Sequence, residues 1–192
     1  METLHKKLSE MMLAGFEKKL TFTQSERDKL GYMLRVLMSE GEKLVLLLGL
    51  ALCFHVLSEF LIAFLAMTLS RSFVGGIHRD TYGGCLLHTV LYFTVVLLLA
   101  EYVTAFNVYP FFGLFAVLIC LTDPVTAKQR GKISERRRKR LKRYAMLGLC
   151  ICLLMCVMLP QYETVVFYAT LIVHLEHLLV VMQERRRSVC WE

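Results

Sequence analysis

Residues 71–85 read RSFVGGIHRDTYGGC, and this polar, glycine-rich stretch separates two long apolar runs. A bilayer core about 30 Å thick takes about 20 apolar helical residues to cross. Three runs approach or exceed that length, at residues 44–69, 85–106 and 163–182. Two further runs, at residues 108–121 and 144–159, are shorter and therefore marginal. This pattern predicts an all-α, polytopic membrane helix bundle.

The composition agrees with a membrane protein. Of 192 residues, 56% are hydrophobic and only three are proline, and the mean hydropathy is +0.53. An ordinary soluble domain has a lower apolar fraction. The seven cysteines are an odd number and lie mostly in apolar runs, where they behave as small hydrophobic residues, so we expect no disulfide framework.

Positive charge is concentrated in one segment. Residues 122–143 contain ten of the 23 basic residues, against only Asp123 and Glu135. Such a run between membrane spans is typical of a cytoplasmic loop, and it would also suit an anionic lipid surface or an acidic partner. Nucleic-acid binding is not expected, because the run does not belong to a folded domain with aromatic platforms. The basic tail, residues 183–192, is expected on the same side.

These assignments constrain the number of spans. If both basic segments are cytoplasmic, residues 71–85 are cytoplasmic as well. Residues 1–43 have amphipathic helical spacing, which predicts an interfacial region that lies on the membrane. Residues 44–69 then form either one tilted span of roughly 39 Å or two short re-entrant helices that break near residues 54–58. Alternatively, the second amphipathic segment before residue 43 takes part in a crossing. We therefore expect a single integral membrane domain over residues 1–192, with four full spans plus short or re-entrant helices, up to six in all.

Residues 71–85, the interrupting segment between the two apolar runs, carry two groups suited to covalent chemistry. Cys85 precedes a long apolar helix, and a thiolate is favoured at a helix N-terminus or beside an imidazole such as that of His78. On one straight helix the two residues would be about 10.5 Å apart along the axis, so they can meet only if the chain bends. The glycine pairs at residues 75–76 and 83–84 would allow the bend. Asp80 is a candidate for orienting the imidazole. The alternative is a loop in which a histidine happens to precede a core cysteine.

A rival set of ionisable residues lies inside the apolar runs, where such groups are functional candidates by default. The set comprises His55, Glu59, His174, Glu176 and His177. It would suit a small metal-ion or proton-coupled transporter, or polar groups that hydrogen-bond between helices. No complete metal-ligand spacing occurs in it, so no metal site is predicted. A noncatalytic adaptor that recruits a partner through its basic loop is a third alternative.

The residues of the interrupting segment also carry a family resemblance. Arg71, Gly75, Gly76, His78 and Cys85, placed between two apolar helices, closely resemble the signature of the accessory gene regulator protein B family. Members of that family are bacterial intramembrane cysteine endopeptidases of quorum sensing. The chain is also similar in its length, its amphipathic N-terminus and a DPVTAKQRGK stretch at residues 123–132 that opens the basic loop.

The resemblance implies an activity and roles for single residues. Cys85 would be the nucleophile and His78 its base, while Arg71, Gly75 and Gly76 would shape the loop and place the substrate. The substrate would be a propeptide of the accessory gene regulator D type, which is cleaved and then cyclised to a thiolactone or lactone. We expect the acidic part of this propeptide to bind basic-loop residues, with these candidates: Lys128, Arg130 and Lys132. The resemblance further implies a bacterial cell-membrane protein with a cytoplasmic active site, no cofactor, and a homodimer.

Overall fold

A computed structural model of the chain describes residues 10–16, 22–75, 81–103, 107–124 and 134–189, with side chains described up to residue 183. The chain divides into two compact units, Met1–His55 and Val56–Glu192. The prediction that the chain forms one integral membrane domain stays a prediction.

The first unit is dominated by one long helix, α2, which covers Gln24–Cys53. Thr23 caps it: its hydroxyl accepts a hydrogen bond from the Glu26 backbone N–H, and the Glu26 side chain accepts one from the Thr23 backbone N–H. This reciprocal capping box starts a helix efficiently. Because no proline follows, α2 continues through residue 43, where the amphipathic region was expected to end. Residues 10–16 form a separate short helical segment.

The apolar run at residues 44–69 is broken, as one alternative predicted. Helix α2 ends at Cys53 and α3 (Leu57–Val74) begins four residues later. His55 between them has a φ of 57°, a left-handed conformation that a helix cannot continue. The re-entrant alternative required two short helices, whereas the helix before the break has 30 residues.

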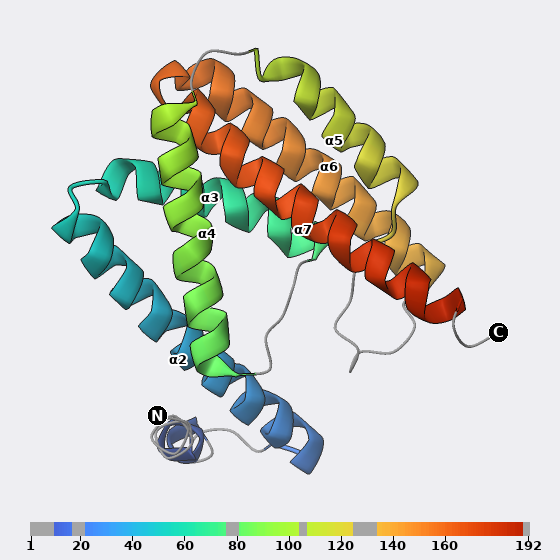
Figure 1. Ribbon diagram of the computed structural model, residues 1–192. Coiled ribbons are helices and arrows are strands. Elements are labelled where there is room, and N and C mark those ends of the chain that lie inside the picture. The colour runs from blue at the N-terminus through green and yellow to red at the C-terminus, as the bar shows by residue number, and fades with distance from the viewer. Residues whose placement is uncertain (1–9, 17–21, 76–80, 104–106, 125–133, 190–192) are drawn as a thin grey trace. The chain divides into compact units, whose positions relative to one another are not determined.

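The second unit is a bundle of five α-helices (Figure 1). After α3, the chain forms α4 (Tyr82–Tyr102), α5 (Tyr109–Leu121), α6 (Glu135–Met158), a short 3₁₀ turn at Pro160–Tyr162, and α7 (Glu163–Val189). No strand occurs in the part of the chain that the structure describes, so the all-α prediction is confirmed. Among the described residues, four helices are long and apolar enough to cross a membrane. These are α3, α4, α6 and the helical stretch Pro160–Gln183. At 13 residues, α5 is only about 20 Å long, less than a bilayer core.

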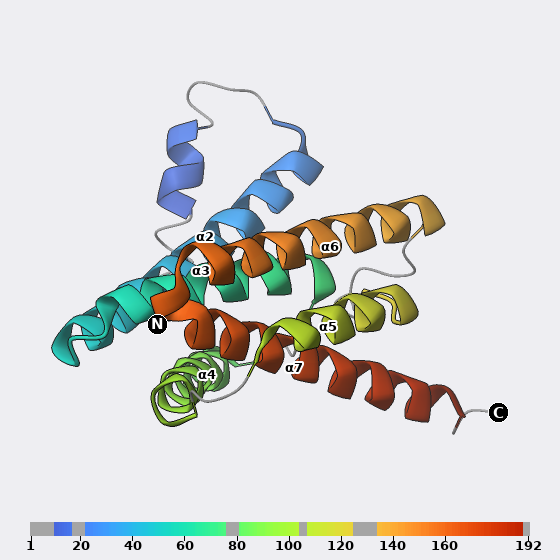
Figure 2. The same ribbon diagram turned by 90° about the horizontal axis from the view of Figure 1, so that it is seen from above.

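Helix α7 lies at the centre of this bundle (Figure 2), where it packs against α3, α4 and α6. Inside its most apolar window 56% of residues are buried, against 22–28% in the other three spans. His174, Glu176 and His177 of α7 are buried and therefore face neighbouring helices. In contrast, the outer helices expose large apolar side chains such as Leu91 and Leu154, as a lipid-facing surface requires.

Small residues allow the helices to approach closely. Ala63 and Ala66 of α3 and Cys152 and Cys156 of α6 have no exposed surface. Small side chains at helix crossings are typical of membrane bundles, because close packing replaces the hydrophobic driving force that lipid removes. The two buried cysteines thus have a packing role.

Candidate active site

Cys85 lies in the first turns of α4, and the preceding residues explain why the helix begins there. Thr81 is the N-cap: its hydroxyl accepts a hydrogen bond from the Gly84 backbone N–H at 3.2 Å, and its carbonyl accepts one from the Cys85 N–H at 3.0 Å. Unpaired N–H groups in a first helical turn favour negative charge nearby. The Cys85 side chain is partly exposed. A thiol at this position is accessible in the first turns of a long helix.

The two glycine pairs of the interrupting segment differ in backbone conformation. Helix α3 ends at Val74, and Gly75 follows with a φ of 86°, in the region that favours glycine. The expected bend therefore begins at Gly75. The expectation that Gly83 and Gly84 also bend the chain was wrong, because both are helical residues of α4 once Thr81 has capped it. Residues 71–85 therefore do not form one straight helix, which would have kept residues 78 and 85 apart, because α3 and α4 are separate helices.

Other predicted site residues lie outside the described part of the chain. His78, Gly76 and Asp80 fall within residues 76–80, and Lys128, Arg130 and Lys132 fall within residues 125–133. Their predicted roles, including the approach of His78 to Cys85, stay predictions.

The structure brings together a cluster that the sequence did not single out as one site. His88 of α4 and Arg71 of α3 both face Glu176 of α7. The His88 Nε2 atom lies 2.8 Å from Glu176 Oε1, and the Arg71 Nη2 atom lies 3.9 Å from Glu176 Oε2. The 2.8 Å separation is short enough for an ion pair with a protonated imidazole, although its angles do not meet those of a hydrogen bond. The Glu176 side chain is only 9% exposed. Sequence analysis missed His88; its spacing of three residues from Cys85 was the available signal.

The rival transporter set is dispersed by the fold. His174 donates a hydrogen bond from Nδ1 to the Thr170 carbonyl at 2.8 Å, and its ring stacks on Phe115 with ring centroids 4.7 Å apart. Near the α2–α3 break, Glu59 instead accepts a hydrogen bond from the Ser58 hydroxyl at 2.8 Å. Across the described residues, no three His, Cys, Asp or Glu side chains are arranged to hold a metal ion.

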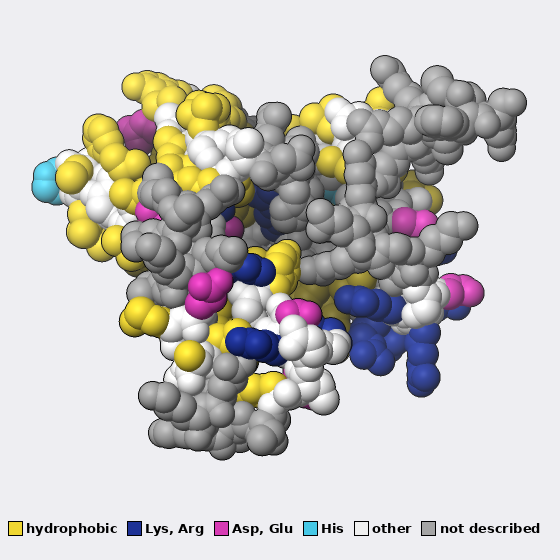
Figure 3. All heavy atoms as spheres, turned by 90° about the horizontal axis from the view of Figure 1, so that it is seen from below, with side chains coloured by type: hydrophobic (Ala, Val, Ile, Leu, Met, Phe, Trp, Pro, Cys, Tyr) yellow, Lys and Arg dark blue, Asp and Glu magenta, His cyan; other side chains and the backbone are white. Residues whose placement is uncertain are grey.

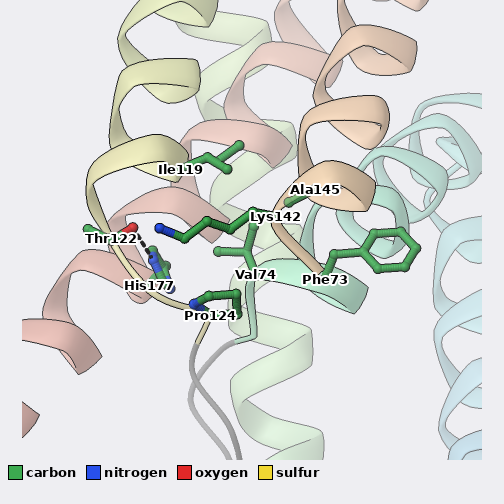
Figure 4. Close-up of a pocket in the computed structure, with 8 residues that line it drawn as sticks. All are labelled: Phe73, Val74, Ile119, Thr122, Pro124, Lys142, Ala145 and His177. Atoms are coloured by element: carbon green, nitrogen blue, oxygen red, sulfur yellow. Dashed lines mark hydrogen bonds between the residues drawn. The ribbon is translucent and has the colours of Figure 1, made fainter. Parts of the chain in front are cut away.

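His177, the last member of that set, lines a small pocket between the ends of several helices (Figure 4). Its Nε2 atom is 2.8 Å from the Thr122 hydroxyl, which itself donates to the Leu118 carbonyl at 2.7 Å. Because that hydroxyl has one proton, His177 Nε2 is the donor to Thr122. The pocket lining combines α3, α6, α7 and the end of α5: Phe73, Val74, Ile119, Thr122, Pro124, Lys142, Ala145 and His177.

This arrangement places the end of α3 beside the flanks of the basic loop. Asp123 pairs with Arg138 at 3.0 Å and with Lys142 at 3.2 Å, and Lys142 also donates to the Cys120 carbonyl at 3.0 Å. The first residues of α6, from Arg136 to Arg140, are exposed and form a basic patch (Figure 3). The C-terminal end of α3 and this basic patch therefore lie at the same end of the bundle.

Comparisons with known proteins point to one family. The family model described as Accessory gene regulator B matches residues 9–182. A curated relative, an AgrB-like protein of Clostridium beijerinckii, is 25% identical over 138 residues, which cover 71% of this chain and 69% of the relative. No solved structure matches the chain. With four membrane-capable helices, the chain is a membrane protein that belongs to the Accessory gene regulator B family and thus to the accessory gene regulator system of quorum sensing.

Proposed function

We propose that the protein is an intramembrane cysteine endopeptidase that cleaves a quorum-sensing propeptide of the accessory gene regulator D type and promotes its cyclisation. The observation that carries this proposal is the position of Cys85: a partly exposed thiol in the first turns of α4, directly after the glycine-rich segment. The family match supports a role in the same signalling system.

In the proposed first step, His78 takes the proton of the Cys85 thiol, and the thiolate attacks the carbonyl of the scissile peptide bond. The carbon–nitrogen bond breaks, and the departing amine of the C-terminal fragment receives the proton from the imidazole. The N-terminal part of the propeptide remains attached to Cys85 as a thioester.

In the second step, a thiol or hydroxyl within the same propeptide attacks this thioester. The bond to Cys85 breaks, its sulfur recovers a proton, and a cyclic thiolactone or lactone leaves. Exchange of one thioester for another is nearly balanced in energy, so exclusion of water from the acyl-enzyme decides between cyclisation and hydrolysis. No cofactor is required for either step.

The propeptide would approach from the cytoplasmic side. The exposed basic patch at Arg136–Arg140 supports this orientation, because basic residues beside spans are retained in the cytoplasm. Lys128, Arg130 and Lys132 of the adjoining loop would hold the acidic part of the propeptide. Formation of a homodimer stays a prediction from the family resemblance.

The decisive experiment co-expresses the propeptide with single variants. Cys85→Ala and His78→Ala should each abolish cleavage, whereas Cys120→Ala, which changes an exposed cysteine on α5, should leave cleavage intact. In the wild type, mass spectrometry should detect a propeptide fragment attached to Cys85. Cleavage that persists in Cys85→Ala would overturn the proposal.

A further inference from the structure

A nearly buried carboxylate joins three helices around the candidate active site. Glu176 comes from the central helix α7, Arg71 from the last turn of α3, and His88 from the second turn of α4 (Figure 1). Each oxygen of the carboxylate faces a different partner: Oε1 faces His88 and Oε2 faces Arg71.

Burial of the Glu176 carboxylate has a high desolvation cost, which only charged or polar partners can offset. Carboxylates inside membrane bundles are rare and are held by paired partners, because desolvation of an unpaired charge is strongly unfavourable. Here the two partners bracket Cys85 in the sequence: Arg71 is the first residue of the segment 71–85, and His88 lies three residues after its end. Glu176 therefore fixes both ends of the segment from a third helix.

Helix geometry places His88 close to the thiol. Residues three apart on a helix share a face, with Cβ atoms about 5–6 Å apart. Cys85 and His88 are both within α4 and three residues apart, so the imidazole that Glu176 holds is on the Cys85 face of the helix. The Glu176 carboxylate lies 2.8 Å from His88 Nε2, so its charge favours one orientation of the ring.

From these contacts we propose that Glu176 is a positioning residue of the active site, which acts through His88 and Arg71 to hold the imidazole and the guanidinium around Cys85. This inference rests on the proposed peptidase function and extends it. The competing interpretation is an ion-pair cluster that only stabilises the bundle.

The test uses the full-length protein in lipid vesicles, with the propeptide as substrate. Glu176→Gln keeps the shape of the side chain and removes its charge, Glu176→Asp keeps the charge, and Glu163→Gln makes the same change at the other end of α7. We expect Glu176→Gln to lower kcat at least about tenfold with little change in KM, Glu176→Asp to recover a large part of the loss, and Glu163→Gln to match the wild type.

A second readout does not depend on the propeptide. The rate at which iodoacetamide alkylates Cys85, followed by peptide mass spectrometry, should fall in Glu176→Gln and recover in Glu176→Asp. If Cys85→Ala still cleaved the propeptide, the peptidase function would fail, while the alkylation rates would still test the cluster.

Two results would overturn the positioning role. One is a Glu176→Gln variant that melts at a lower temperature but cleaves as fast per folded molecule as the wild type. The other is an alkylation rate of Cys85 that is unchanged in that variant. If Glu176→Gln does not fold, His88→Gln replaces it, because that change leaves Glu176 with Arg71; an unchanged kcat in His88→Gln would equally overturn the proposal.

Discussion

Gly148 of α6 lies directly against the backbone of Leu69 in α3: a Cβ atom at residue 148 would stand 2.7 Å from the Leu69 carbonyl oxygen. Real Cβ atoms do not approach so closely, and the atom in the way belongs to the main chain, which cannot rotate aside. The contact holds α6 beside α3, the helix that ends at Gly75 and leads into the candidate active site.

Gly148→Ala is therefore expected to destabilise the bundle by about 1–3 kcal/mol, the usual cost of overpacking. Gly113→Ala in α5 is the matched control, because a Cβ there meets nothing within 4 Å. Thermal unfolding in detergent would compare the two variants. Equal melting temperatures would show that α3 and α6 can separate without cost.

Tyr92 of α4 donates a hydrogen bond from its hydroxyl to the Ala169 carbonyl of α7 at 2.6 Å, and the residue is 4% exposed. We expect Tyr92→Phe to lower the free energy of unfolding by about 1 kcal/mol, since one interhelical hydrogen bond is lost. Tyr102→Phe changes an 80% exposed tyrosine on the same helix and should have no effect. A cost of zero for Tyr92→Phe would mean that the free Ala169 carbonyl finds another donor.

The N-terminus of α2 should respond to acid. The Glu26 carboxylate accepts hydrogen bonds from the Thr23 backbone N–H and from the Thr23 hydroxyl. These bonds, the backbone one most, hold the pKa of Glu26 below its ordinary value. Because the folded-state pKa is lowered, the stabilisation is present above the unfolded-state pKa of about 4.3 and is lost as the pH falls through the folded-state pKa.

The protection of the first α2 amides against hydrogen exchange, measured relative to the intrinsic exchange rate at each pH, should thus fall in acid in the wild type. In Thr23→Ala the same amides should exchange roughly five times faster already at pH 7, because the cap is absent, and glutamate protonation should then add little. An acid response as large in Thr23→Ala as in the wild type would contradict this account.

Lys128, Arg130 and Lys132 are expected to contribute to propeptide binding through charge. Replacing all three with Gln should weaken binding of a propeptide with an acidic tail at low salt, and the difference from the wild type should shrink as salt screens the charges. Vesicle binding over a range of NaCl concentrations measures both effects. The matched control replaces Arg185, Arg186 and Arg187 with Gln, which removes the same charge from the tail. Equal weakening by both triple variants would indicate general attraction rather than a binding loop.

The sequence by itself determined the fold class, and it singled out Cys85 as the candidate nucleophile. Apolar run lengths predicted membrane-spanning helices, and the polar stretch at residues 71–85 predicted where two of them separate. Both features are local: the length of an apolar run and the presence of glycine or a capping threonine act within a few residues. The break near residues 54–58 could be anticipated for the same reason.

Only the tertiary structure decided which polar residues act together. His174, Glu176 and His177 are neighbours in the sequence, yet they face different surroundings, because successive residues of a helix point about 100° apart. Glu176 instead meets Arg71 and His88, which come from two other helices. The sequence could place Glu176 in a membrane helix, but its partners depend on how α3 and α4 cross α7, and that crossing is set by the packing of small residues over the whole bundle.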